Sequence, residues 1–130
     1  MANTPIPEDL RRFILTSIPS VPFLEALLLM RADLNQAWRG DTLAARLYVR
    51  EKTAESLLHE LCTAGMAERY DAPGAPAYRY RPESALLRAR VDGLAGLYAS
   101  HLVEVTLVIH STLDRKAQQF ADAFKWRKDA

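Results

Sequence analysis

The sequence predicts a mainly α-helical fold with one short β-hairpin and a long C-terminal helix. Three observations predict it. Apolar residues recur at helical spacing over most of the 130 residues. Two short alternating segments flank a loop rich in proline and glycine near residues 71–76. Beyond this hairpin, apolar residues recur at steps of three and four for more than twenty residues. The length and the 49% share of hydrophobic residues fit one globular domain.

The composition excludes several classes of protein. No apolar run approaches the roughly 18 residues of a membrane span, and residues 1–5 lack the features of a signal peptide. Cys62 is the one cysteine, which excludes an internal disulfide and suits a reducing compartment. A cytoplasmic protein without a membrane partner is therefore expected. The net charge is +1 and evenly distributed, so the sequence displays no basic patch typical of nucleic-acid binders.

The first 40 residues predict two helices and an extended stretch. The first helix is expected from Pro7 to about Ile18, because proline suits a first turn and an apolar stripe follows it. Ser20 is expected to cap a second, very apolar helix over about residues 21–34. Trp38 is expected to be buried in a short extended stretch that can join the hairpin as a strand.

Residues 41–66 predict two short helices joined by a tight turn. Asp41 is expected to cap the first, which runs from Thr42 to about Tyr48, and the second runs from about Glu51 to Ala64. Gly65 is expected to end it in the left-handed conformation. The small and apolar residues of this segment have helix-turn-helix spacing: Leu43, Ala44, Leu47, Val49, Ala54, Leu58, Leu61 and Met66.

Residues 66–81 predict the hairpin, with its loop from Asp71 to Pro76. With the preceding helices they form the run TLAARLYVREKTAESLLHELCTAGMAERY. This run resembles the winged helix-turn-helix superfamily, most nearly its MarR-like transcriptional regulators. The resemblance covers about residues 10–82 and implies a bacterial-type regulator. In such a protein the second helix of the motif enters the DNA major groove, and the hairpin is the wing.

The C-terminal segment, residues 83–130, is expected to dimerise and to form one structural unit with the winged domain of residues 1–82. A helix from Glu83 to about Ile109 is expected, then a shorter one from about Leu113 to Trp126. The first would be about 40 Å long, too long for so small a domain to bury. Packing within the same chain is the alternative. The expected interface of a homodimer comprises Leu87, Val91, Leu94, Tyr98, Leu102 and Val105.

The resemblance implies double-stranded DNA as a partner and a set of residues that would contact it. Three lie on the recognition helix, one directly before it and three on the strands of the wing: Lys52, Ser56 and His59; Arg50; and Arg69, Arg79 and Arg81. The three wing arginines are expected to share one face if the strand register allows. The alternative is that Arg79 and Arg81 pair with neighbouring carboxylates such as Glu68.

The sequence therefore predicts a sequence-specific, DNA-binding transcriptional regulator that acts as a homodimer and is not an enzyme. The alternative is a winged-helix module that binds a protein partner and not DNA, which the even charge and the acidic recognition helix favour. No cofactor or metal is expected, because the three histidines lie on different elements without cysteine at ligand spacing. For Cys62, a buried thiol is the favoured interpretation over a redox sensor.

Overall fold

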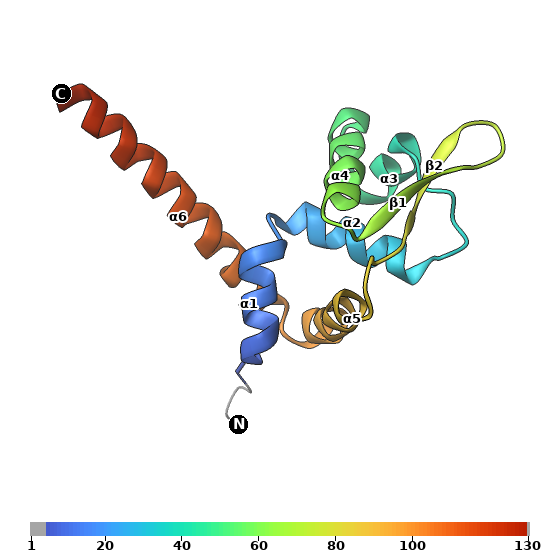
Figure 1. Ribbon diagram of the computed structural model, residues 1–130, viewed down its shortest axis with the longest axis horizontal. Coiled ribbons are helices and arrows are strands. Elements are labelled where there is room, and N and C mark those ends of the chain that lie inside the picture. The colour runs from blue at the N-terminus through green and yellow to red at the C-terminus, as the bar shows by residue number, and fades with distance from the viewer. Residues whose placement is uncertain (1–4, 130) are drawn as a thin grey trace.

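The computed structural model describes the backbone of residues 5–129 and the side chains of these residues except 113, 114, 116 and 122–129. Figure 1 shows the arrangement of the helices and strands in this part of the chain. Their order is α1 (Glu8–Ser17), α2 (Val21–Ala32), α3 (Gly40–Leu47), α4 (Glu51–Thr63), β1 (Ala67–Asp71), β2 (Pro76–Tyr80), α5 (Ala85–Ser100) and α6 (Leu102–Asp129).

The first two helices lie within two residues of their expected bounds and meet at 109°. Pro19 separates them, and Ser20 caps α2 as expected: its Oγ accepts a hydrogen bond from the Phe23 N–H at 3.2 Å. The apolar sequence of α2 places it in the middle of the molecule. Its residues Phe23, Leu24 and Leu27 are almost completely buried.

The start of α3 differs from the expectation that Asp41 would cap it. The helix already begins at Gly40, and the Asp41 carboxylate accepts a hydrogen bond from the neighbouring Thr42 N–H at 2.8 Å within the first turn. The cause is the preceding Trp38, which pairs with the wing and keeps the backbone extended through Arg39. Helical geometry can therefore start only at Gly40.

The turn between α3 and α4 depends on a left-handed residue. Tyr48 has φ 57° and ψ 44°, a conformation that costs a residue other than glycine about 1–2 kcal/mol. Its N–H and that of Val49, the latter at 3.2 Å, both donate to the Ala44 carbonyl. Val49 packs against the core, as expected, and so holds the turn in place.

The wing is a two-stranded antiparallel sheet in which Glu68 pairs with Arg79 and Arg69 with Tyr78. The expected contribution of Trp38 is confirmed. Its N–H donates to the Tyr78 carbonyl at 3.2 Å and its carbonyl accepts from the Tyr78 N–H at 2.7 Å, which adds one bridge to the outer edge of β2. Gly65, with φ 75°, ends α4 and starts β1 as expected.

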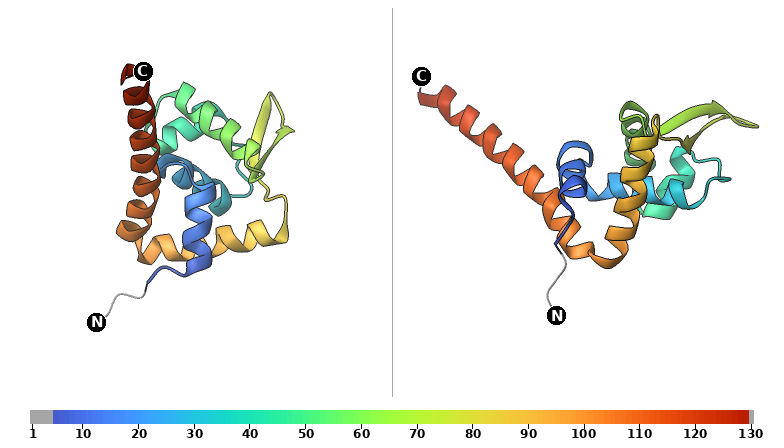
Figure 2. Two further views of the ribbon diagram at one scale, coloured as in Figure 1. Left: turned by 60° about the vertical axis from the view of Figure 1, so that its left-hand side comes forward. Right: turned by 60° about the horizontal axis from the view of Figure 1, so that its bottom comes forward.

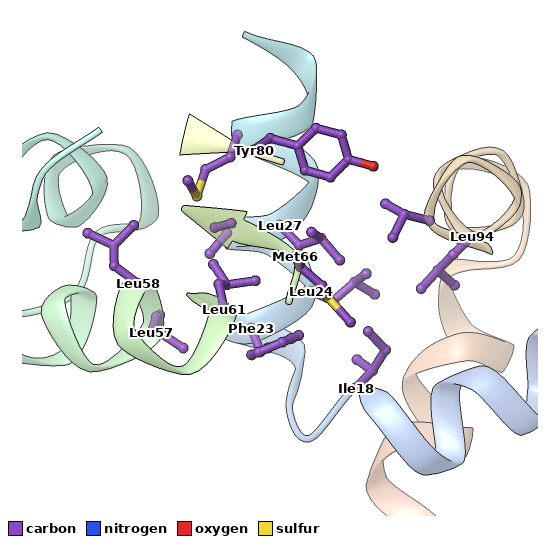
Figure 3. Packing of buried hydrophobic residues seen from close by; sticks show 14 of the residues in the cluster. Ile18, Phe23, Leu24, Leu27, Leu57, Leu58, Leu61, Met66, Tyr80 and Leu94 are labelled. Carbon is purple, nitrogen blue, oxygen red and sulfur yellow. The ribbon is translucent and has the colours of Figure 1, made fainter. Parts of the chain in front are cut away.

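The core lies where α2, α4, the base of the wing and α5 converge. Figure 3 shows Leu61 of α4 on the side of Phe23 and Leu27 of α2, with Leu58 on the opposite side of α4 and Met66 near the start of the wing. The completely buried Trp38 and Leu43 extend this core beneath α3. The second helix of the motif, α4, is thus fixed on the rest of the molecule by its apolar face.

The expectation of one continuous helix from Glu83 to Ile109 is wrong. The chain turns by 117° between α5 and α6, and His101 at the corner has the non-helical dihedrals φ −131° and ψ 43°. The expected break near residue 110 is also wrong, because α6 is continuous from Leu102 to Asp129. Both views of Figure 2 show the corner and the straight path of α6 beyond it.

The corner lets both helices pack against α1. Val91 and Leu94 of α5 and Val105 and Ile109 of α6 are completely buried in the same chain. A straight helix would carry the last two away from the core. Gly93 allows a close approach of α1, since a Cβ there would lie 3.2 Å from a methyl carbon of Leu10.

Burial within the chain removes half of the expected dimer interface. Val91, Leu94 and Val105 are unavailable to a partner, and Leu87 and Tyr98 are partly buried. Leu102 remains exposed. The exposed large apolar side chains of α5 and α6 within the described residues are Leu86, Leu102, Val103, Leu107 and Phe120.

Candidate nucleic-acid interface

The second helix of the motif, α4, presents one apolar and one polar side. Ala54, Leu57, Leu58 and Leu61 are buried against the core. Lys52, Ser56 and His59 are exposed, and their spacing of four and three residues places them in one stripe along the helix. The structure therefore brings the three expected recognition side chains together.

The beginning of α4 is open to an anion. Its N-cap residue is Arg50, and no side chain among the described residues caps the first N–H groups of the helix. Such groups and the helix dipole favour a phosphate. Arg50 and Lys52 are exposed, and neither has an ion-pair partner in the described part of the chain.

Carboxylates lie beside these cations. A polar cleft of about 470 Å³ separates α4 from the wing, and Asp41, Glu51 and Glu55 line it together with Arg39 and Arg69. The Glu55 side chain lies over Gly40, where a Cβ would come within 2.6 Å of its Cγ. Carboxylates outnumber arginines in this cleft, so a phosphate is held less well inside it than at the exposed beginning of α4.

At the other end of α4 the surface is less polar. His59 lines a pocket of about 350 Å³ with Thr63 of its own helix, Thr16 of α1, Phe23 of α2 and Pro19 between these two helices. The expected stripe thus runs from a cationic beginning at Arg50 to a largely apolar end at His59.

The expectation that Arg69, Arg79 and Arg81 share one face of the wing is wrong. In the observed register Arg79 lies opposite Glu68, and Arg69 lies opposite Tyr78. Successive side chains of a strand point to opposite faces, so Arg69 lies on the other face from Glu68 and Arg79. Arg69 is exposed and without an ion-pair partner among the described residues.

The other two wing arginines converge on one carboxylate. The Arg79 Nε donates to Glu68 Oε1 at 2.6 Å, and the Arg81 Nη1 donates to the same oxygen at 3.2 Å. The Arg79 guanidinium also lies 4.5 Å from the centre of the Tyr70 ring. The hydrogen bond from Arg79 lowers the pKa of the Glu68 carboxyl, and the charges of both arginines add to this effect. The alternative interpretation of Arg79 and Arg81 as ion-pair partners is confirmed.

Sequence reasoning missed two residues of this face. Arg39 donates from Nη2 to the carbonyls of Pro73 at 3.1 Å and Ala75 at 2.9 Å, and so holds the wing loop. These contacts join Arg39 to residues more than thirty positions away, so no local sequence pattern predicts them. Tyr48 is 94% exposed in the turn before α4. The short turn between the two helices requires a residue in the left-handed conformation, and this requirement could have identified Tyr48 from the sequence.

Cys62 lies half-buried in the last turn of α4. Burial raises the pKa of the Cys62 thiol, and the nearby Glu68 charge adds to the rise, so the thiol is protonated near neutral pH. Within the described residues, no group of three or more histidine, cysteine or acidic side chains could hold a metal ion. In the same part of the chain, no single helix is long and apolar enough to span a membrane.

The helix-turn-helix of α3 and α4, followed by the β1–β2 hairpin and its Trp38 bridge, defines a winged helix-turn-helix fold. No protein-family model matches the sequence. The comparison with curated proteins finds no match either.

Solved structures with this architecture are similar to the chain. A mutant of MepR from S. aureus bound to an oligodeoxyribonucleotide is 14% identical, with a TM-score of 0.53, over 93% of this chain and 89% of that one. The MarR family transcription regulator SP03579 is 22% identical over 90% and 82% of the two chains, with a TM-score of 0.46. RV1404 from Mycobacterium tuberculosis is 14% identical over 85% and 69%, with a TM-score of 0.49. The similarity to MepR confirms the expected fold.

Proposed function

We propose that the protein is a non-enzymatic, DNA-binding transcriptional regulator. The observation that carries the proposal is the exposed stripe of α4, which begins at an uncapped helix end with two unpaired cations, Arg50 and Lys52. A recognition helix needs such an arrangement, because cations and free N–H groups hold phosphates while the side chains beyond them reach base edges. The structurally similar MepR mutant was solved with an oligodeoxyribonucleotide, which supports the proposal.

In this proposal the contacts have different roles. Arg50, Lys52 and Arg69 hold phosphates, whereas Ser56 and His59 read base edges. Arg79 and Arg81 contribute less than an unpaired arginine, because Glu68 already engages both. The free thiol of Cys62 is consistent with a cytoplasmic location.

Titration of mixed genomic duplex fragments at about 50 mM salt tests the function. We expect micromolar or tighter binding that weakens steeply with salt. The double variant Arg50→Ala, Lys52→Ala should reduce the slope of log affinity against log salt by about 1.8, the value for two lost phosphate contacts. Ser56→Ala should instead change the preference among fragments. Absence of binding at micromolar protein contradicts the proposal.

The second candidate function is a winged-helix module that binds a protein. The cleft between α4 and the wing favours it, since Asp41, Glu51 and Glu55 suit a basic peptide better than a phosphate backbone. If the chain binds no duplex DNA at low salt, this candidate becomes the leading one.

We also propose that the regulator acts as a homodimer through residues 83–130, while residues 1–82 carry the DNA-binding face. The support is the exposed apolar surface of α6, where Val103 and Leu107 are both 62% exposed. A symmetric partner would cover this surface. It would also present a second α4, and two copies about 34 Å apart reach successive major grooves.

Sedimentation equilibrium at tens of micromolar protein should show a dimer, because this concentration lies well above a dissociation constant of about 1 μM for the two copies. Leu107→Asp should shift it to monomer without loss of helix content, because Leu107 is exposed in the single chain. Leu34→Asp, at a similarly exposed leucine beyond α2, is the control and should stay dimeric. A monomeric wild-type protein at this concentration contradicts the proposal.

A further inference from the structure

Tyr48 combines two features that the fold does not need. It is the only residue other than glycine with a positive φ in the described part of the chain. Glycine would take this conformation without strain. A bulky residue in such a conformation is retained only where something else favours its side chain.

Nothing in the described part of the chain provides that compensation. The Tyr48 ring is 94% exposed, so it contributes almost no burial to the core. The turn is instead held by backbone hydrogen bonds to the Ala44 carbonyl and by the packing of Val49. A glycine at position 48 would keep both of these interactions.

The position of the tyrosine indicates what its side chain meets. It ends α3 and lies between two exposed arginines, Arg46 and Arg50. In a helix-turn-helix, the first helix crosses the DNA backbone and the beginning of the second enters the major groove. The turn between them therefore lies at the edge of the groove, beside the phosphates.

We infer that Tyr48 is a contact to the DNA backbone: its hydroxyl donates a hydrogen bond to a phosphate oxygen, between phosphates held by Arg46 and Arg50. This inference rests on the proposed DNA-binding function. The contact reads no base, so it strengthens binding to all duplex sequences alike. The strained turn is retained because it places an aromatic hydroxyl where glycine would place none.

Three variants test this inference in the full-length protein. Tyr48→Gly should raise the melting temperature by about 4 °C, as relief of a left-handed residue predicts for a chain of this size, and weaken duplex binding about two- to tenfold. Tyr48→Phe keeps the strain and loses only the hydroxyl, so its melting temperature should be unchanged while its affinity falls. Tyr48→Asn tolerates the turn without a phenol and should behave like glycine.

The salt dependence separates this inference from the proposed function. Loss of a neutral hydroxyl leaves the slope of log affinity against log salt unchanged, whereas Arg50→Ala should reduce it by about 0.9. If Arg50→Ala weakens binding but Tyr48→Gly is more stable and binds as tightly as wild type, the inference is overturned and the function stands. If wild type binds no duplex, both are overturned.

Discussion

Replacement of Trp38 by alanine is expected to lower the free energy of unfolding by about 3–5 kcal/mol. Trp38 is the largest completely buried side chain among the described residues, and its backbone bridges to Tyr78 of the wing. Its indole N–H also donates to the Asp33 carbonyl at 3.4 Å. The truncation leaves a cavity between α2, α3 and the wing and should loosen the wing itself. Urea unfolding followed by circular dichroism measures the loss.

Two further variants separate burial from mere removal of an apolar side chain. Trp38→Phe fills part of the cavity and should lose less stability than alanine. Leu34→Ala removes an apolar side chain that is 61% exposed, four residues earlier, and should change stability by under about 0.5 kcal/mol. A Trp38→Ala protein as stable as Leu34→Ala would show that the wing is not anchored through this residue.

Replacement of Glu68 by glutamine is expected to tighten DNA binding about tenfold at moderate salt, because it removes the negative charge that pairs with two guanidinium groups and leaves them more available to phosphates. Glu68 alone holds both Arg79 and Arg81. Its amide isostere keeps the shape of the side chain but removes the charge. The slope of log affinity against log salt should steepen by up to about 1.8, the value for two added phosphate contacts.

Acid should not reproduce this effect. Because Arg79 and Arg81 lower the pKa of Glu68, its carboxylate stays charged as the pH falls from 7 to 5, and the pair persists. Affinity measured across this range should therefore show no gain from the wing.

The matched control for Glu68→Gln is Glu8→Gln, which makes the same change in net charge at the exposed start of α1. Equal tightening in both variants would mean that net charge, and not the release of the two arginines, sets the affinity. The double variant Arg79→Ala, Arg81→Ala should act in the opposite direction. It leaves the Glu68 carboxylate bare on the wing and should weaken binding to every sequence alike.

Local chemistry made most of the fold predictable. Ser20 can satisfy the free N–H groups of α2, Gly65 can adopt the positive φ that ends α4, and the apolar spacing of α4 identifies its buried side. The pairing of the stretch around Trp38 with the wing was predictable too, since a large aromatic side chain in a polar loop is stabilised by burial. Each of these features depends on residues only a few positions apart, so it can be recognised in the sequence.

The corner at His101 was not predictable in this way, because apolar spacing continues through it without a break. The chain turns there so that Val105 and Ile109 reach α1, a contact between the two ends of the sequence. The arrangement of the wing arginines was missed for a similar reason. The strand register, which decides whether Arg79 meets Glu68 or stands beside Arg69, depends on which residues pair across the wing. Propensity and alternation alone do not fix that pairing.

The corner at His101 also means that a small change of angle there would move the far end of α6 by a long distance. Beyond it α6 is a straight rod of 28 residues, about 42 Å long at the rise of an α-helix. A rotation of about 10° at the pivot would sweep the far end of such a rod through about 7 Å. In the proposed dimer, the angle at which α6 leaves its contact with α1 would therefore bear on the distance between the two copies of α4.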